Sequence, residues 1–275
     1  MSTSVAHSAR HLPQLMVEKV WGRDRLPEPF AAKNEKRIGE IWFDPPAEMP
    51  DLLVKYLFTS EKLSVQVHPS NANALPSEQG KEECWLVLDA EPGAQLAIGF
   101  DEPLSREEIR AAALDGSIEN LLTWHAVKPG DFYYLPAGTV HAIGAGIALV
   151  EVQQNSDTTF RLYDYGRPRE LHLERALAVA DGGPYDGANI GSIAACSSTL
   201  IDREYFRLDR VEGAPDLSVR GAYPGGLLAL PLSGAVQARG KDGPLCATAG
   251  ECLYAQSIDA LDFNAAGITL LTRSA

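Results

Sequence analysis

The sequence predicts a mainly β protein built from many short strands. Eight runs rich in apolar and β-branched residues follow one another closely, and glycine, proline, asparagine and aspartate separate them. Short strands with turn residues between them are typical of a β-sandwich or a β-barrel. The predicted strands cover Arg37–Phe43, Leu52–Phe58, Leu63–His68, Cys84–Leu88, Gln95–Phe100, Phe132–Leu135, Ala148–Val152 and Thr158–Asp164.

Two short helices interrupt this pattern. Ser105 followed by Glu108 is a capping-box sequence, and it precedes a helical stretch that Asp115-Gly116 should end. This stretch is a small helical insert within the first series of strands. A second helix is predicted over Leu173–Ala180. The first residues, up to about Pro13, are polar, and we expect them to be frayed.

The chain divides into two similar units in this interpretation. The glycine-rich stretch 181–191 resembles a linker, which predicts domains at residues 1–185 and 186–275. A constant offset of 120 residues lays 130–134 on 250–254 and 147–152 on 267–272, so the second domain should repeat the first. The strand 227–232 should correspond to the strand that carries Glu83. The offset places Leu261 at the position of His141 and Leu271 at that of Glu151, so we expect the second unit to lack polar ligands.

Composition excludes several classes of protein. The 275-residue chain is 45% hydrophobic and has a net charge of −13 with no basic patch, which argues against nucleic-acid binding. It contains no apolar run long enough to cross a membrane and no signal-peptide pattern, so we expect a soluble, cytoplasmic protein. Its four cysteines have no metal-binding or redox spacing and should be reduced, mostly packed thiols; these are Cys84, Cys196, Cys246 and Cys252. The oligomeric state is left open.

Three separated segments offer side chains that could hold a metal ion. Because residues two apart in a strand share a face, Gln66 and His68 should point the same way, and so should Lys81 and Glu83. A second imidazole comes from His141, after a Pro-Ala-Gly turn. Imidazole, carboxylate and amide oxygen suit zinc, and would also accept manganese, cobalt or iron. Taken singly, each of these residues is more often structural than a ligand.

Together these motifs resemble the type I mannose-6-phosphate isomerases of the cupin superfamily. The similarity spans about residues 17 to 180 and includes Gly39-Glu40-Ile41-Trp42 and the segment 151–161 that ends in Arg161. The resemblance implies cupin-type jelly-roll barrels, hence a bicupin with a small helical insert in its first barrel. It also implies one zinc ion per chain, and the ligands that correspond to those of the family are Gln66, His68, Glu83 and His141. The insert around 105–124 stands where the family has a large helical domain.

The resemblance also implies a reaction, the interconversion of mannose 6-phosphate and fructose 6-phosphate through an enediol. The family's catalytic arginine and active-site lysine correspond to Arg161 and Lys81. Glu151 is a candidate for the proton shuttle, although a metal-bound water or a histidine could serve instead. We expect Lys81 to attract the anionic sugar phosphate against the negative charge of the chain. We assign His125 and His172 to structure, and Cys84 to the core because it should face away from Glu83.

Two other functions remain compatible with the sequence. A non-enzymatic cupin could keep the metal and the pocket and serve as a sugar-binding or sensor module. An isomerase of a different sugar would need the same chemistry. Arg161 and Lys81 beside a full set of ligands favour an enzyme, but salt bridging of Arg161 with Glu151 inside a barrel would explain both residues without catalysis.

Overall fold

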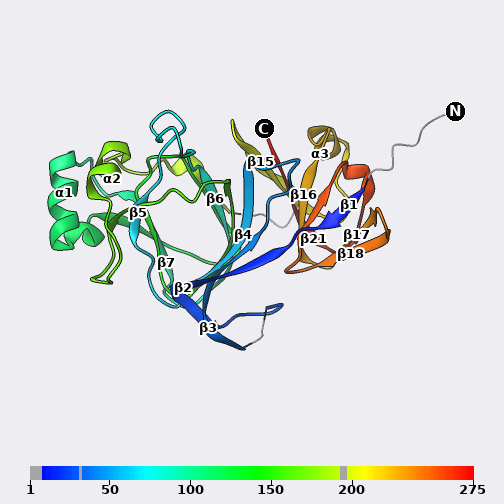
Figure 1. Ribbon diagram of the computed structural model, residues 1–275, viewed down its shortest axis with the longest axis horizontal. Helices are drawn as coiled ribbons and strands as arrows, with labels where there is room; N and C mark the ends of the chain where they lie inside the picture. Colours follow the sequence, from blue (N-terminus) through cyan, green and yellow to red (C-terminus); the bar gives the residue numbers. More distant parts are fainter. Residues whose placement is uncertain (1–7, 31–32, 193–196) are drawn as a thin grey trace.

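The computed structural model describes residues 8–30, 33–192 and 197–275. Within them the chain is mainly β, as predicted, and the strands form three curled sheets arranged along the long axis of the molecule (Figure 1). Each of the eight predicted strands is present, and Leu52–Phe58 and Gln95–Phe100 match to the residue, but the sequence did not predict the strands Gln14–Arg25, Leu122–Ala126 and His141–Ile143. None of the described helices is both long and apolar enough to cross a membrane.

The central sheet has seven strands and carries most of the candidate residues. Its strands, in spatial order, are β13 (Ile190–Ser192), β9 (Asp131–Leu135), β6 (Glu83–Ala90), β11 (Ile147–Gln154), β4 (Leu52–Phe58), β3 (Lys33–Phe43) and β2 (Gln14–Arg25). A five-stranded sheet faces it, in the order β12 (Phe160–Tyr163), β5 (Val65–Val67), β10 (His141–Ile143), β7 (Gln95–Phe100) and β8 (Leu122–Ala126). Apolar side chains from both sheets, such as Trp85 and Ile98, pack together between them.

Helices cover the outer face of the five-stranded sheet (Figure 1). The helix α1 (Arg106–Asp115) has the predicted capping box at Ser105 and ends at Gly116, whose φ of 84° lies in the left-handed region that glycine favours. The helix α2 (Leu173–Val179) packs beside it. The outward-facing Val65 and Val67 contribute to this layer, so the predicted alternation of β5 is confirmed. Short 3₁₀ turns cover Ser117–Asn120, Gly187–Asn189 and Ile258–Ala260.

A nine-stranded sheet packs against the other face of the central sheet. Its path is β14 (Ser198–Asp202), β15 (Phe206–Glu212), β21 (Ile268–Ser274), β16 (Leu227–Ser233), β19 (Leu253–Ala255), β1 (Ala9–His11), β17 (Ala235–Gly240) and β18 (Gly243–Thr248), with β20 (Leu261–Phe263) beside β17. The helix α3 (Leu217–Ala222) flanks it. Cys84 lies in the core between the two sheets, facing away from the Glu83 side as expected. Cys252 is buried and Cys246 exposed, and Cys196 lies outside the described residues.

Two strands pair across the predicted boundary between the domains. Ala9–His11 pairs with β19, so the expectation of a frayed start is wrong for these residues. Ile190–Ser192, at the end of the predicted linker, pairs with β9 of the central sheet. Both contacts join segments far apart in sequence, which local patterns do not report. The division into residues 1–185 and 186–275 stays a prediction.

The repeat at an offset of 120 residues is visible in the turns and the strand order. In the turn before β9, the Lys128 N–H donates to Asp131 Oδ2 at 2.9 Å, and in the turn before β19 the Thr248 N–H donates to Glu251 Oε2 at 2.8 Å. The order β9-β6-β11-β4-β3 in the central sheet corresponds to β19-β16-β21-β15-β14 in the nine-stranded sheet. The two sheets therefore share a plan of five consecutive strands.

Candidate metal centre

A polar cavity of about 310 Å³ lies on the inner side of the central sheet. Most of the candidate residues from the sequence line it, from both sheets of the first unit. They are joined by charged residues that the sequence interpretation did not single out, namely Lys19, Glu40, Lys55, Asp157 and Arg169, and by His172. The cavity walls thus alternate ammonium or guanidinium groups with carboxylates in a largely buried setting.

Two imidazoles and one carboxylate converge beside this cavity, and the carboxylate, that of Glu83, lines it. Glu83 lies between the histidines, with its Oε2 3.5 Å from His68 Nε2 and its Oε1 3.4 Å from His141 Nε2. One ligand atom from each of the three residues lies within 4.8 Å of the others, and all three side chains are buried. This spacing suits three ligands around one divalent cation.

Backbone hydrogen bonds orient both imidazoles toward that point. The Nδ1 atom of His68 is 2.9 Å from the Thr158 carbonyl, and Nδ1 of His141 is 2.9 Å from the Thr139 carbonyl. A carbonyl oxygen only accepts, so each Nδ1 carries the proton and each Nε2 keeps a lone pair. His68 Nε2 and Glu83 Oε2 are buried without a hydrogen-bond partner among the described residues. A cation between them would satisfy both atoms, so the residues present fit a metal ion.

Burial keeps these imidazoles neutral, as metal ligands must be. Burial lowers the pKa of His141 to about 4. It lowers the pKa of His68 well below the usual value, and the nearby Lys81 ammonium adds to the effect. Neither histidine therefore needs to lose a proton at neutral pH before binding a cation.

Gln66 completes the group that the sequence singled out. It pairs directly with His141 across β5 and β10, and its amide nitrogen is 3.2 Å from His141 Nε2. Its Oε1 accepts a hydrogen bond from Ser64 at 3.0 Å. Rotation of the amide by 180° would exchange the two atoms and place an oxygen beside His141 Nε2. In the described structure the facing atoms of His68, Glu83 and His141 are the ones that could bind a metal. Gln66 differs, because it presents its amide nitrogen, and not its oxygen, to His141.

Lys81 and Glu151 lie beside the three ligands. Lys81 Nζ is 3.3 Å from Glu83 Oε2, which confirms that these two side chains share a face, and 3.7 Å from Glu151 Oε1. Lys55 approaches Glu151 Oε1 to 3.1 Å from the neighbouring strand β4, as an ion pair without hydrogen-bond geometry. Burial and the Glu83 carboxylate raise the pKa of Glu151 to about 7, although both lysines oppose this shift. A carboxyl group with such a pKa can gain or lose a proton near neutrality.

Arg161 lines the cavity with an unpaired guanidinium. Its Nε is buried without a hydrogen-bond partner in the described part of the chain, and burial and the neighbouring Arg169 lower its pKa. No ion pair joins it to Glu151 among the described residues, so mutual salt bridging does not account for the two residues. Arg169 is held by Asp164 through two hydrogen bonds of 2.5 and 2.7 Å. This end of the cavity is therefore suited to an anion.

His125 and His172, both assigned to structure from the sequence, differ in their placement. His125 lies against the rings of Tyr133 and Tyr185, away from the cavity, as the structural assignment expected. His172 lines the cavity and stands directly before α2, so its assignment to structure stays a prediction. Its Nδ1 accepts a hydrogen bond from the Arg161 backbone N–H at 3.3 Å.

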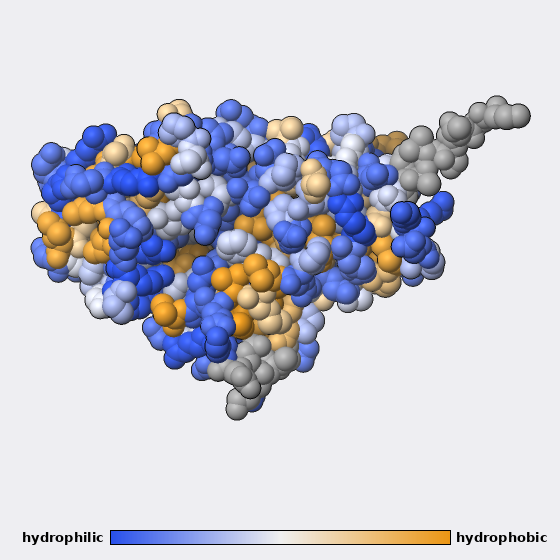
Figure 2. All heavy atoms as spheres, in the orientation of Figure 1, coloured by the Kyte–Doolittle hydropathy of each residue, from blue (hydrophilic) through white to orange (hydrophobic). Residues whose placement is uncertain are grey.

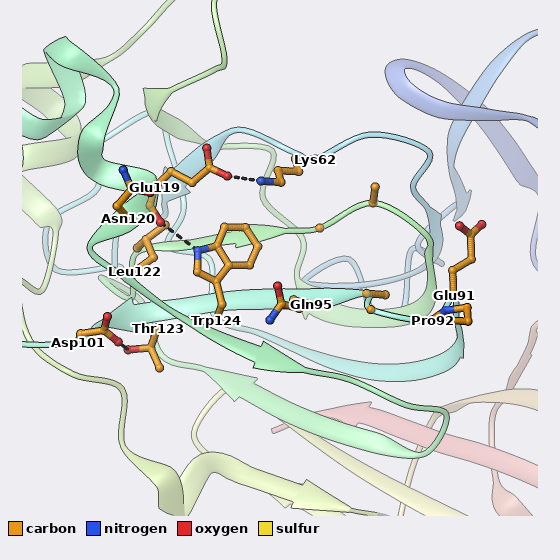
Figure 3. A pocket seen from close by; sticks show the side chains of 14 residues that line it. Lys62, Glu91, Pro92, Gln95, Asp101, Glu119, Asn120, Leu122, Thr123 and Trp124 are labelled. Atoms are coloured by element: carbon orange, nitrogen blue, oxygen red, sulfur yellow. Dashed lines mark hydrogen bonds and ion pairs between the residues drawn. The ribbon is translucent and has the colours of Figure 1, made fainter.

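A larger hollow of about 840 Å³ elsewhere on the first unit contains none of the candidate residues. Figure 3 shows Trp124 at its centre, with Lys62 paired to Glu119 on one side and Thr123 bonded to Asp101 on the other. The indole Nε1 of Trp124 donates to the Glu119 carbonyl at 2.9 Å. Four of the polar side chains here are paired with one another, namely Lys62 with Glu119 and Thr123 with Asp101. Hydrophilic side chains also cover most of the face shown in Figure 2.

A β-barrel-like pair of sheets with a buried His/Glu/His group inside it fits the cupin superfamily. Comparison with known proteins identifies which members of this superfamily the chain is similar to. Four curated relatives, named as established, probable or putative mannose-6-phosphate isomerases, align at 41–49% identity. The enzyme of Streptococcus mutans is 49% identical over 136 residues, which cover 46% of this chain and 43% of that one. The alignments span about half the length of these relatives, and at most 65%. No protein-family model matches the chain.

Solved structures agree with the sequence relatives. The mannose 6-phosphate isomerase of Bacillus subtilis superposes with a TM-score of 0.74 at 27% identity, covering 96% of this chain and 99% of that one. A zinc-bound mannose 6-phosphate isomerase shares the fold, with a TM-score of 0.71 at 14% identity over 98% of this chain and 100% of that one. The chain is a relative of the mannose-6-phosphate isomerases, and the resemblance that its motifs indicated is confirmed.

Proposed function

We propose that this protein is an aldose–ketose isomerase that interconverts mannose 6-phosphate and fructose 6-phosphate through an enediol intermediate. The observation that carries the proposal is the buried His68/Glu83/His141 group, whose Glu83 lines the same cavity as Arg161, a guanidinium with no ion-pair partner among the described residues. The named relatives support the choice of substrate. A module that only held a sugar would need neither a buried carboxyl group with a pKa near 7 nor an unpaired guanidinium beside it.

The metal we propose is one zinc ion per chain. His68, Glu83 and His141 would hold it through their facing atoms, and Gln66 would join them through its amide oxygen. When bound, zinc would act as a Lewis acid that stabilises negative charge on the sugar oxygens. Two nitrogen and two oxygen ligands, with no thiolate, are compatible with this ion and with non-redox chemistry.

Three side chains around the proposed metal centre would carry out proton transfer, charge stabilisation and substrate binding. Glu151 would take the proton from the carbon next to the carbonyl and return it to the neighbouring carbon. Arg161 would stabilise the negative charge that develops on the sugar during this transfer, because its guanidinium has no competing carboxylate partner among the described residues. Lys81 would hold the substrate and keep Glu151 oriented from 3.7 Å.

We further infer the architecture that accompanies this function. The strand order shared by the central and nine-stranded sheets supports two cupin-type jelly-roll barrels, the first with the α1 insert and the metal centre. The boundary would fall near residue 185, apart from the two crossing strands. An enzyme that acts on a sugar phosphate would work in the cytoplasm, where such metabolites occur.

A coupled assay with mannose 6-phosphate tests the proposal directly. Purified protein should form fructose 6-phosphate, a chelator should abolish the activity, and zinc should restore it. Full activity in protein shown to be free of metal would overturn the role of the metal. Binding of the sugar phosphate by metal-loaded protein without turnover would favour a sugar-binding module instead, and turnover of another sugar alone would change the substrate.

A further inference from the structure

A chain of buried ion pairs connects the candidate metal centre to the outer strands of the central sheet. Glu40 on β3 is at its far end, with Oε1 3.1 Å from Lys55 Nζ and Oε2 2.9 Å from Lys19 Nζ. Lys55 continues the chain to Glu151, whose Oε1 is 3.1 Å away. Glu40 is only 5% exposed and Lys55 only 4%, so water screens neither charge effectively. The sign of charge alternates at every step.

Lys55 is the member of this chain whose position most needs an explanation. Its ammonium lies between two carboxylates from the strands on either side, since Lys55 pairs with Glu151 on β11 and with Trp42 on β3. A buried ammonium is stable only where carboxylates and hydrogen bonds compensate its lost hydration. Among the described residues, Glu40 is the only one that accepts a hydrogen bond from Lys55. Glu151 is an incomplete partner because Lys81 also approaches its Oε1.

Glu40 is itself held rigidly. Trp42 Nε1 donates to its Oε2 at 3.2 Å, and the same oxygen receives Lys19 from β2. The two lysines lower the pKa of Glu40 to about 2 against the opposing effect of burial, so the carboxylate is charged at any pH at which the fold is expected to work. Glu40 therefore presents a fixed negative charge to Lys55. A change of its rotamer would break its contacts with three donors, Lys55, Lys19 and Trp42.

We propose that Glu40 is a positioning residue that fixes the Lys55 ammonium against Glu151. Its contacts among the described residues are Lys55, Lys19 and Trp42, and none of the predicted metal ligands, so we infer that it acts through Lys55. The proposal rests on the function proposed above for Glu151, because the proton transfer by that carboxyl group is what a misplaced Lys55 would slow. Without the charge of Glu40, the ammonium would lose its hydrogen-bonded partner and shift within the cavity.

A double-mutant cycle tests this directly. Glu40→Gln keeps the size and the hydrogen bond from Trp42 and removes the charge, and Lys55→Met removes the ammonium. We expect Glu40→Gln to lower kcat about tenfold or more with little change in KM. This loss is smaller than the full rate contribution of a positioned acid–base group, because Glu151 itself remains in place. If Glu40 acts through Lys55, the double variant should be no slower than Lys55→Met alone. Losses that multiply in the double variant, or a normal kcat in Glu40→Gln, would overturn the proposal.

A matched control and a second measurement separate this proposal from the isomerase assignment. Glu18→Gln removes an exposed carboxylate on β2, paired with Lys36 at 2.8 Å, and should leave kcat unchanged. Zinc content should be equal in all variants. If zinc-loaded wild type has no isomerase activity, the proposed function fails, and NMR of lysine labelled with ¹³C at Cε then decides the role of Glu40. The Lys55 signal, assigned by its loss in Lys55→Met, should shift in Glu40→Gln, and an unmoved signal would contradict the inference.

Discussion

Leu227 occupies the position in the second unit that Glu83 occupies in the first. Glu83 on β6 pairs with Leu135 on β9, and Leu227 on β16 pairs with Ala255 on β19, 120 residues after Leu135. Leu227 is fully buried. It packs in one apolar cluster with Leu261 and Leu271, which correspond to His141 and Glu151 at the same offset. The positions that form the candidate metal centre and its neighbour Glu151 in the first unit thus correspond to a leucine core in the second.

One metal ion per chain is the first prediction from this relationship. Leucine offers no ligand atom, and filling the equivalent positions with apolar side chains contributes roughly 1.5–3 kcal/mol of stability per buried residue. Elemental analysis of purified protein should give one zinc per chain, and His141→Leu should lose it. Two tightly held ions in the wild type, or an undiminished ion in His141→Leu, would contradict a single centre in the first unit.

Local alternation along the strands predicts which candidate side chains share a face. Gln66 lines the cavity and His68 lies beside Glu83, while Val65 and Val67 pack outward under the helices, and Lys81 contacts Glu83. The prediction works because each strand has one face toward the cavity, so a period of two separates its residues. The same argument, extended by the offset of 120, located the leucines of the second unit before any contact was known.

The residues that the sequence interpretation missed depend on register between strands. Lys55 lies in the middle of the apolar run Leu52–Phe58, and a lone ammonium in such a run was the available signal that it faces a polar cavity. Its partner Glu40 was noted only as part of a motif, since nothing local shows that β3 and β4 bring them together. Ala9–His11 likewise pairs with β19, more than 240 residues away. Such pairings depend on how the whole chain packs, so a short window of sequence does not predict them.

Arg161→Ala tests whether the unpaired guanidinium acts on the transition state. We expect kcat and kcat/KM to fall together, by about 10²-fold or more as for other groups that stabilise developing charge, while zinc content stays normal. Steady-state kinetics and elemental analysis on the same preparation would measure both. A rise in KM with unchanged kcat would instead identify Arg161 as a clamp for the ground-state phosphate.

Tyr223→Phe tests the contribution of the second unit to stability. Tyr223 is buried, and its hydroxyl lies 2.7 Å from Asp209 Oδ2, an oxygen that also accepts from Arg207 Nε at 2.6 Å. Removing the hydroxyl leaves the buried carboxylate with one donor fewer and should cost about 1–3 kcal/mol of unfolding free energy. Denaturant unfolding would measure this loss, and kcat of the zinc-loaded protein should be unchanged. A large loss of kcat in the folded variant would show that the second unit acts on the metal centre.

The last prediction concerns the stability of the metal-free protein in acid. Burial lowers the pKa of His141 from 6.5 to about 4, so between these values the unfolded state binds the proton that the folded state excludes. Stability from this group is complete above pH 6.5 and is lost as pH falls toward 4, by up to about 3 kcal/mol. The lowered pKa of His68 acts in the same direction. The raised pKa of Glu151, about 7, acts oppositely, because the folded state then binds the extra proton below neutrality.

A difference between two metal-free proteins isolates the effect of His141. His141→Gln removes the titrating imidazole and leaves Glu151 in place, so subtracting its unfolding free energy from that of the wild type cancels the contribution of the carboxyl group to first order. The advantage of wild type over the variant should shrink steadily between pH 6.5 and 4, and urea unfolding at several pH values would measure it. A difference that stays constant through this range would mean that His141 is solvated and freely protonated in the metal-free fold, contrary to its burial.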